Sequence, residues 1–402
     1  MSIPRHILLA ATLAACGSAD AREALVTIDT LPGGIPRVTT AAPIDSGMWA
    51  LVHERDVRPA EGEPGELLNP SDLALADDGT LYVVEDNPVV VNVYGSDGRF
   101  VKVLTREGSG PGEVSSAWIA LRGDTLAIQD PSQSRGTTLD VRDGSLISTR
   151  VTAGRYWHPI GIDGQGRAVA RMMLPPDSTT GPRQGYVRFA MTGEVTDTAI
   201  VPERAEPAGL KQWAVGEGGR MMFSRQVPLR PRGEHAVDPT GGFVTGWSGE
   251  YALVASRNGA DTSMVFRRPF TAEPVTASQK TDIVEQVIAG FAMNQMGVTE
   301  DMLRKAFDPS AIPDQRPAFE GLWVDRAGRR WVRLSSADTT TVRLDLFDRD
   351  GRWLDQLSVP STDWPREAWQ PTSFSRDRVA VILEGEDGLP AIRVFRIVRR
   401  EG

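Results

Sequence analysis

A short sequence unit recurs along most of this chain, and its pattern is clearest in residues 69–104. The unit contains four runs of alternating or β-branched residues, NPSDLALADDG, TLYVVED, VVVNVYGSDG and RFVKVL. Gly79 and Gly98 fall in the turns, where a residue that tolerates positive φ is needed. Because one such unit cannot bury its apolar faces alone, neighbouring copies must stack, and the repeat constrains the fold more than local propensity does.

Five further copies follow. Four complete copies begin at Ser115, Trp157, Glu234 and Phe319, and a sixth begins at Trp369 and ends one strand short. The turn SDGRF of the first unit returns almost letter for letter as RDGRW in the fifth. Four short antiparallel strands per unit are typical of one blade of a β-propeller.

The strand missing from the last unit is expected at the other end of the chain. The run MWALVHERDV, residues 48–57, precedes AEGEPGE just as RFVKVLTR precedes EGSGPGE. It therefore occupies the fourth-strand position of a blade whose other strands are C-terminal. We predict that residues 49–57 pair with residues 392–398, which would close the ring and remove exposed strand edges.

Residues 276–307 depart from the strand period. Apolar side chains there recur at helical spacing, Thr276 with Gln279 fits a capping box, and Gly297 before TED marks a stop and a second start. The sequence predicts a helical pair inserted between the fourth and fifth units. Two roles stay open, packing on the propeller or covering the channel mouth as a lid.

The repeats resemble those of six-bladed β-propellers of the NHL-like type, a group that includes bacterial lipoproteins. The resemblance covers residues 48–400 and implies a disc with a central channel and binding at one face. The predicted fold class is all-β, a six-bladed β-propeller of four-stranded antiparallel blades closed by an N-terminal strand, with a short helical insertion. Lyases, lactonases and pure binding modules share this fold, so the resemblance implies no single activity.

The N-terminus carries a targeting pattern. Arg5 precedes the apolar run ILLAATLAA, which is too short to span a bilayer and long enough for a signal-peptide core. The run ends in LAAC, which resembles the bacterial lipobox, and Cys16 is the only cysteine of the chain. We predict a signal peptide over residues 1–15, lipidation of Cys16, and a tether over residues 16–47 with one short strand at LVTIDTL. An ordinary secretory signal with an incidental cysteine is the alternative.

Lipidation would place the protein in the bacterial cell envelope, attached to a membrane through its acyl chains. Gly17 stands where many lipoproteins retained in the inner membrane have aspartate. This favours the outer membrane, with the protein facing the periplasm or the cell exterior.

The net charge of −9 and the scattered basic residues argue against a nucleic-acid partner. Histidines are also few. The lyases on this fold need imidazoles that converge from several blades, and only His158 and His235 fall near predicted inner strands. A three-histidine zinc site is therefore not expected.

Carboxylates and tryptophans are the remaining candidates. Calcium-dependent lactonases of the resembling fold hold the ion with Glu, Asp and Asn side chains, and Asn69, Asp72 and Glu320 lie near predicted inner-strand starts. Most other acidic residues stand in turns such as DDG and DRAG, where Asp accepts backbone hydrogen bonds. Tryptophans that recur near first strands would either pack between blades or form a stacking surface for sugar rings; they are Trp118, Trp157, Trp323 and Trp369.

The glycine-rich stretch REGSGPGEV, residues 106–114, is not a phosphate loop, because it lacks the following Lys and Ser or Thr and leads into a strand. It marks the passage from one blade to the next.

Three functions remain. The leading hypothesis is a membrane-tethered binding or protein-interaction scaffold, with Asn69, Asp72, Trp118, His158 and Glu320 as channel-face candidates and a protein, small molecule or carbohydrate as partner. The alternative is a propeller hydrolase, such as a calcium-dependent lactonase-like enzyme. A third is a structural lipoprotein that docks through an apolar patch. No cofactor is predicted apart from this possible calcium ion.

Overall fold

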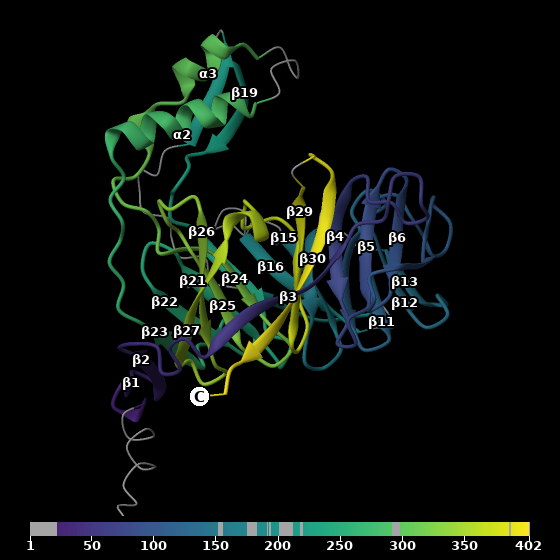
Figure 1. Ribbon diagram of the computed structural model, residues 1–402, viewed down its shortest axis with the longest axis horizontal. Helices are drawn as coiled ribbons and strands as arrows, with labels where there is room; N and C mark the ends of the chain where they lie inside the picture. Colours follow the sequence, from purple (N-terminus) through teal and green to yellow (C-terminus); the bar gives the residue numbers. More distant parts are fainter. Residues whose placement is uncertain are drawn as a thin grey trace, which may run out of the picture.

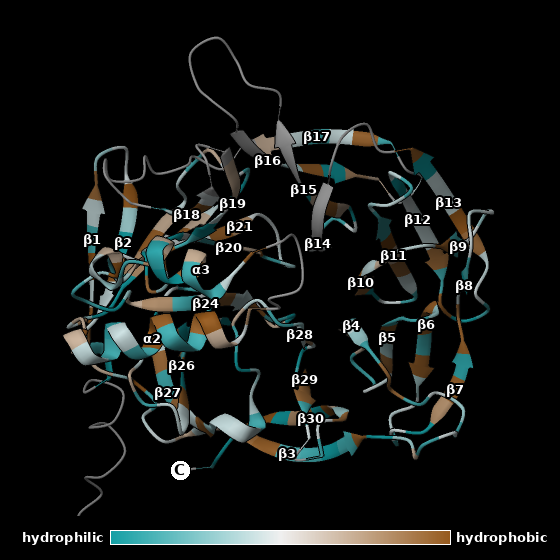
Figure 2. Ribbon diagram, turned by 90° about the horizontal axis from the view of Figure 1, so that it is seen from above, coloured by the Kyte–Doolittle hydropathy of each residue, from teal (hydrophilic) through white to brown (hydrophobic). Residues whose placement is uncertain are grey.

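The computed structural model describes residues 22–151, 156–174, 183–190, 192, 194–200, 212–217, 220–291, 298–385 and 387–401. Within these ranges, six sheets of four or six strands follow one another around a central axis (Figure 2). The first strand of each sheet is innermost and lies beside the inner strands of neighbouring sheets. The chain is therefore a six-bladed β-propeller, as the repeat predicts.

Each of the first five blades is formed by four strands that follow one another in the sequence, whereas the sixth takes one of its strands from the N-terminal part of the chain. Blade one contains β4 (Pro70–Leu75), β5 (Leu81–Asp86), β6 (Val89–Tyr94) and β7 (Phe100–Val103), and blade two contains β10 (Trp118–Arg122), β11 (Thr125–Asp130), β12 (Arg135–Asp140) and β13 (Leu146–Val151). Blade three contains β14 (Tyr156–Ile162), β15 (Ala168–Leu174), β16 (Arg183–Phe189) and β17 (Val195–Ile200). Blade four contains β20 (Gly233–Val237), β21 (Phe243–Trp247), β22 (Ala252–Ser256) and β23 (Met264–Arg267). Blade five contains β24 (Phe319–Val324), β25 (Arg330–Leu334), β26 (Thr341–Phe347) and β27 (Trp353–Pro360).

Blade six closes the ring with an N-terminal strand. It contains β28 (Thr372–Phe374), β29 (Arg378–Glu384), β30 (Pro390–Arg399) and β3 (Trp49–Val57). Strand β3 pairs antiparallel with β30, from Trp49 opposite Arg399 to Val57 opposite Ile392. The predicted closure is confirmed, and Val57 is fully buried in the resulting core.

The turns after the inner strands are capped by aspartates, as the DG pattern predicts. In blade five, the Asp325 carboxylate accepts the backbone N–H groups of Ala327 and Arg329, both at 2.9 Å. It also accepts Arg329 Nε at 2.6 Å and Trp331 Nε1 at 3.0 Å. Asp163 of blade three accepts the corresponding groups of Gln165 and Arg167. Both carboxylate oxygens of each aspartate accept hydrogen bonds, so these acidic residues stabilise the turns.

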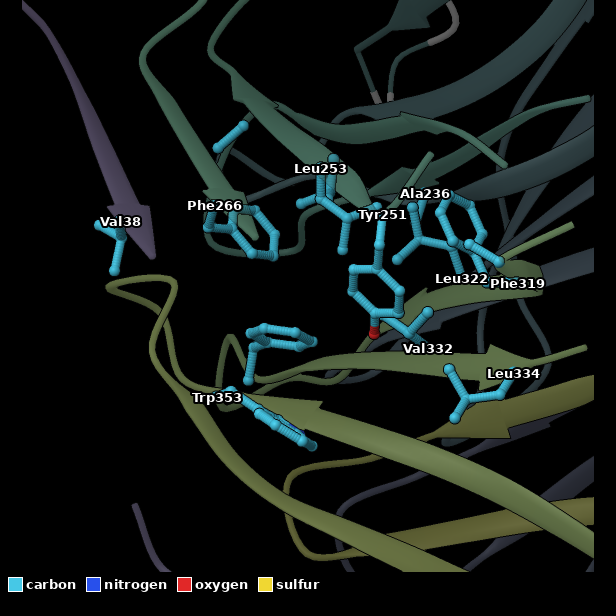
Figure 3. Close-up of a cluster of buried hydrophobic side chains, with 14 residues drawn as sticks. Val38, Ala236, Tyr251, Leu253, Phe266, Phe319, Leu322, Val332, Leu334 and Trp353 are labelled. Atoms are coloured by element: carbon cyan, nitrogen blue, oxygen red, sulfur yellow. The ribbon is translucent and has the colours of Figure 1, made fainter. Parts of the chain in front are cut away.

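The segment predicted as a tether is more ordered than the sequence indicates. Strands β1 (Val26–Leu31) and β2 (Ile35–Thr40) form a hairpin, and β2 adds in parallel to β23, so that blade four has six strands. The strand predicted at LVTIDTL is confirmed as β1, but the prediction of a tether was wrong for residues 22–47, because β2 pairs with β23 and the Val38 side chain is buried. It is 3% exposed and belongs to the core between blades four and five, with Phe266, Tyr251 and Trp353 (Figure 3).

A small module stands above one face of the disc (Figure 1). It consists of the hairpin β18 (Gln212–Glu217) and β19 (Arg220–Gln226), the helices α2 (Ala277–Ala289) and α3 (Glu300–Ala306), and the 3-10 turn η1 (Pro309–Ala311). The two predicted helices are confirmed, and Thr276 caps α2 in a capping box with Gln279.

The module has a core of its own. Trp213 of the hairpin stacks on Phe307 at a ring distance of 4.6 Å, and Val284, Ile288 and Leu303 of the helices complete the cluster. The helices therefore pack on the hairpin, whereas packing on the blades was one of the two roles that the sequence left open. Figure 2 shows them above blades four and five, to one side of the central axis.

Candidate functional site

A cavity of about 350 Å³ lies on the axis of the propeller. All six inner strands contribute to its wall, with Leu73, Ile119, Ile162, His235, Trp323 and Phe374 among the lining residues. No single blade could form it, because each blade contributes only a few side chains to the axis.

An arginine crosses one end of this cavity. Arg326, which follows β24 of blade five, donates from Nη2 to the Leu121 carbonyl of blade two at 2.9 Å and from Nη1 to Asp77 of blade one at 3.2 Å. Blades five and two stand opposite each other in a ring of six, so the Arg326 side chain crosses the axis. Burial lowers the pKa of Arg326, although Asp77 partly offsets this. We call this end the closed end.

The other end, the open mouth, carries aromatic side chains. Trp369, in the connection that leads to β28, lines the cavity and is 75% exposed. Trp323 of β24 also lines it, and its ring is held by Trp364 at 6.4 Å and Phe374 at 6.1 Å. A fixed indole from β24 and an exposed indole from the connection before β28 thus both line the cavity, as does Gln370.

Asp72 brings a carboxyl group to the cavity wall. It lies at a bulge in β4, where Oδ2 accepts the backbone N–H of Ile119 in blade two at 2.8 Å and Oδ1 accepts that of Leu73 at 2.9 Å. Burial raises the pKa of Asp72 to about 7, against the opposing effect of these two hydrogen bonds. The carboxyl group therefore exchanges its proton near neutral pH and also links two blades.

His235 lines the same cavity from β20. Burial lowers its pKa to about 4, and the positive charge of Arg171 lowers it further. The imidazole packs edge-on against Tyr186 at a ring distance of 6.1 Å. At neutral pH it is an uncharged donor and acceptor for hydrogen bonds.

Charged residues of blades four and five flank the open mouth. Glu320 pairs with Arg333 at 2.7 Å, and Arg232 pairs with Glu234 and also donates to the Glu320 carbonyl at 2.8 Å. Burial raises the pKa of both glutamates, against the effect of the neighbouring arginines. These groups tie neighbouring blades together at their inner edges.

The five channel-face candidates from the sequence are not brought together. Asp72 lines the cavity, whereas Asn69, Trp118 and Glu320 are not among its lining residues. The Asn69 N–H donates to Glu85 at 2.8 Å, and Trp118 stands opposite Gln129 in the blade-two sheet. His158 belongs to β14, but its side chain lies outside the described residues.

The three candidate calcium ligands, Asn69, Asp72 and Glu320, therefore do not line one cavity. Among the residues that the structure describes, no group of three or more His, Cys, Asp or Glu side chains is placed to hold a metal ion. Cys16, the predicted lipidation site, lies outside these residues.

The glycine-rich stretch forms a self-contained turn. Its ends, β8 (Arg106–Glu107) and β9 (Glu113–Val114), pair in parallel. The carboxylate of Glu113 accepts the Gly110 N–H at 2.8 Å, and Arg135 donates to the Ser109 and Gly110 carbonyls. A carboxylate of the chain itself already occupies the position that a phosphate would need.

Two residues of the cavity could not be assigned to it from the sequence. Arg326 stands in a DRAG turn like those of other units, and only the opposing blade shows that it crosses the axis. His235 was recognised near an inner strand, yet its place on the cavity wall depends on the register of β20 with β21.

Neither a protein-family model nor a curated protein matches the sequence. Solved structures match in fold. A protein from Bacteroides fragilis described as exported is 11% identical, with 91% of this chain and 99% of that chain covered and a TM-score of 0.47. A member of the DUF4221 family from Bacteroides vulgatus is 9% identical, with 88% and 99% covered and a TM-score of 0.48. Virginiamycin B lyase from Staphylococcus aureus is 8% identical, with 86% and 99% covered and a TM-score of 0.42.

With such low identities, and with TM-scores below 0.5, these likenesses say nothing about what the chain binds or does. In the described part of the chain, no helix is long and apolar enough to span a membrane.

Proposed function

We propose that this protein is a lipid-anchored binding module of the bacterial cell envelope, which holds a ring-shaped polar ligand such as a carbohydrate in the propeller cavity. The observation that carries the proposal is the convergence of Trp323 and Trp369 with Asp72, His235 and Gln370 on a cavity that Arg326 crosses at its far end. The ligand enters and leaves by the open mouth.

The side chains of the cavity favour a ligand with both a flat face and hydroxyl groups. An exposed indole stacks well on the apolar face of a sugar ring. The carboxyl group of Asp72, the neutral imidazole of His235 and the amide of Gln370 offer hydrogen bonds of both polarities to ring hydroxyls. A ligand pocket typically combines an apolar wall with a few such polar groups.

The anchor is supported by the lipobox pattern at residues 13–16 and by the absence of any other cysteine from the chain. Gly17 after the cysteine favours the outer membrane. The intact mass of the mature protein tests this part, since acylation adds the mass of the acyl chains. A Cys16→Ser variant with the same membrane attachment would contradict lipidation.

The ligand proposal is tested by titrating the protein with a panel of soluble malto-, cello- and chito-oligosaccharides and recording tryptophan fluorescence. We expect at least one member to bind and the Trp369→Ala variant to bind it roughly 2- to 10-fold more weakly, as the loss of one stacking contact predicts.

Val101→Ala is the matched control. Val101 is 58% exposed on β7 and does not line the cavity, so this variant should bind like the unaltered protein. Failure of every oligosaccharide to bind, or equal binding by the Trp369→Ala variant, would contradict the proposal.

A further inference from the structure

The N-terminal hairpin fixes where the chain leaves the propeller. Strand β2 pairs with β23 through Arg37, Val38 and Thr39, and Thr39 accepts a hydrogen bond from Arg267 Nε at 3.1 Å. Thr40 is fully buried and accepts the Trp353 N–H at 3.1 Å. The hairpin is therefore part of blade four.

The chain on both sides of the hairpin is also attached. Asp45, which is nearly buried, pairs with Arg22 at 3.1 Å and with Arg399 at 3.1 Å. The carboxylate of Asp355 accepts the N–H groups of Gly47 and Trp49 at 3.0 and 2.9 Å. The attachment thus begins at Arg22, close to the predicted lipidation site in the sequence.

Only residues 17–21 separate Cys16 from Arg22. Six Cα-to-Cα steps span at most about 20 Å. A free tether over residues 16–47 would instead reach roughly 100 Å. An acyl group on Cys16 would therefore hold the hairpin side of blade four close to the bilayer.

The hairpin lies on the opposite side of the disc from the module. In Figure 1, β1 and the C-terminus lie low, whereas α2 and α3 stand high. The module belongs to the β17–β20 and β23–β24 connections, and Trp369 belongs to the β27–β28 connection. Each of these connections runs from the outer strand of one blade to the inner strand of the next, and in a propeller all such connections lie on the same face. The open mouth is therefore on the module's face.

We propose that the anchored protein stands on the membrane with its closed end toward the lipid and presents the open mouth and the module away from it. The lipid surface is the partner of the closed face. This orientation rests on the lipidation of Cys16 proposed above. It makes the cavity accessible to ligands from the aqueous compartment and not from the bilayer.

Energy transfer to labelled lipids tests the orientation. The acylated protein is purified, labelled with a donor dye at a single new cysteine, and reconstituted into vesicles that contain a rhodamine headgroup lipid. Arg349→Cys places the dye on an exposed turn beside Gly328 at the closed face, and Gln286→Cys places it on the exposed side of α2. Cys16 is acylated, so each variant has one free thiol.

We expect higher transfer from position 349 than from position 286. In a second form of both variants, a Gly-Ser linker of about 30 residues is inserted between Ala21 and Arg22, outside the folded ring. The linker should lower transfer from position 349 and reduce the difference between the positions, while the protein still floats with the vesicles.

Flotation separates the two proposals. A protein that does not float with vesicles would overturn the lipid anchor and the orientation with it. A protein that floats but shows equal transfer from both positions, or a difference that the linker leaves unchanged, would overturn the orientation alone.

Discussion

The two ends of the propeller cavity are formed by different kinds of connection between strands. At the closed end, short turns repeat from blade to blade, and aspartates such as Asp163 and Asp325 cap them. At the open mouth, the connections are irregular, and two of them carry the hairpin and helices of the module. The repeat therefore maintains a scaffold at one end, whereas the connections at the other end differ from blade to blade.

The side chains differ in the same way. Asp325 is fully buried and accepts four hydrogen bonds, whereas the Glu320 side chain is a third exposed and pairs with Arg333. Trp331 is fully buried beside Asp325, whereas Trp369 at the open mouth is largely exposed. Substitutions at the two ends should accordingly have unequal effects on stability.

The largest difference is expected between Asp325→Ala and Glu320→Ala. Removing Asp325 leaves Arg329 Nε and the Trp331 indole N–H without their acceptor and removes the buried counter-charge of Arg329, which should lower the free energy of unfolding by about 3–5 kcal/mol. Removing Glu320 should cost less than about 1 kcal/mol, because Arg333 keeps its bonds to the Pro365 and Arg366 carbonyls.

Urea unfolding followed by far-UV circular dichroism measures both values. Equal losses in the two variants would show that the turn caps are no more important to the fold than the ion pairs of the mouth.

A smaller loss is expected for Arg326→Met at the closed end. The variant removes hydrogen bonds to blades one and two, one of them to a charged partner, at a cost of about 1–3 kcal/mol. Arg349→Met, on an exposed turn of the same face, is the control and should stay within about 0.5 kcal/mol. Unfolding of the two variants at the same urea concentration would contradict the role of Arg326 as a link across the axis.

The next effect depends on pH and concerns the cavity wall. Burial raises the pKa of Asp72 to about 7 from its ordinary 3.8, so ionising the carboxyl costs more in the folded than in the unfolded state. The stability of the protein relative to Asp72→Asn should therefore fall as the pH rises from about 4 to about 7. Unfolding free energies at intervals across this window test it, and parallel curves would contradict the shift.

His235 should give the opposite slope. Its pKa falls to about 4 from 6.5, so protonation is disfavoured in the folded state. Relative to His235→Phe, the unaltered protein should lose stability as the pH falls from about 6.5 to about 4. The same titration measures both residues, and a pH-independent difference between the protein and His235→Phe would place the imidazole in water.

The smallest effect on stability is expected at the open mouth itself. Trp369→Ala should change the free energy of unfolding by no more than about 0.5 kcal/mol, because the side chain is 75% exposed. A calorimetric melting curve measures it. A loss of several kcal/mol would assign Trp369 to the core and remove it from the proposed ligand surface.

Local patterns predicted the elements that each unit forms by itself. The four-strand repeat, the aspartate turns and the capping box at Thr276 all follow from residues close in sequence, and the structure contains each of them. Closure by β3 was also predictable, because AEGEPGE repeats EGSGPGE and so placed the preceding strand in the register of the last blade.

Contacts between distant segments were not predictable. The hairpin of β1 and β2 reads as a loose tether until Val38 is seen in the core of blades four and five. The helices carry an apolar stripe, but this stripe does not predict that they pack on the hairpin that contains Trp213. Of the five channel-face candidates, only Asp72 is a described lining residue of the cavity, because position near an inner strand does not decide which side chains reach the axis.

The sequence by itself determined the number and type of blades and the position where the ring closes, because a repeat imposes the same hydrogen bonds and apolar alternation on every unit. The tertiary structure decided what the ring encloses. Only when six inner strands meet do Asp72 and His235 enter one cavity and Arg326 reach the opposite blade. Burial on the axis then shifts their pKa values, since desolvation is a property of the assembled ring and of no single blade.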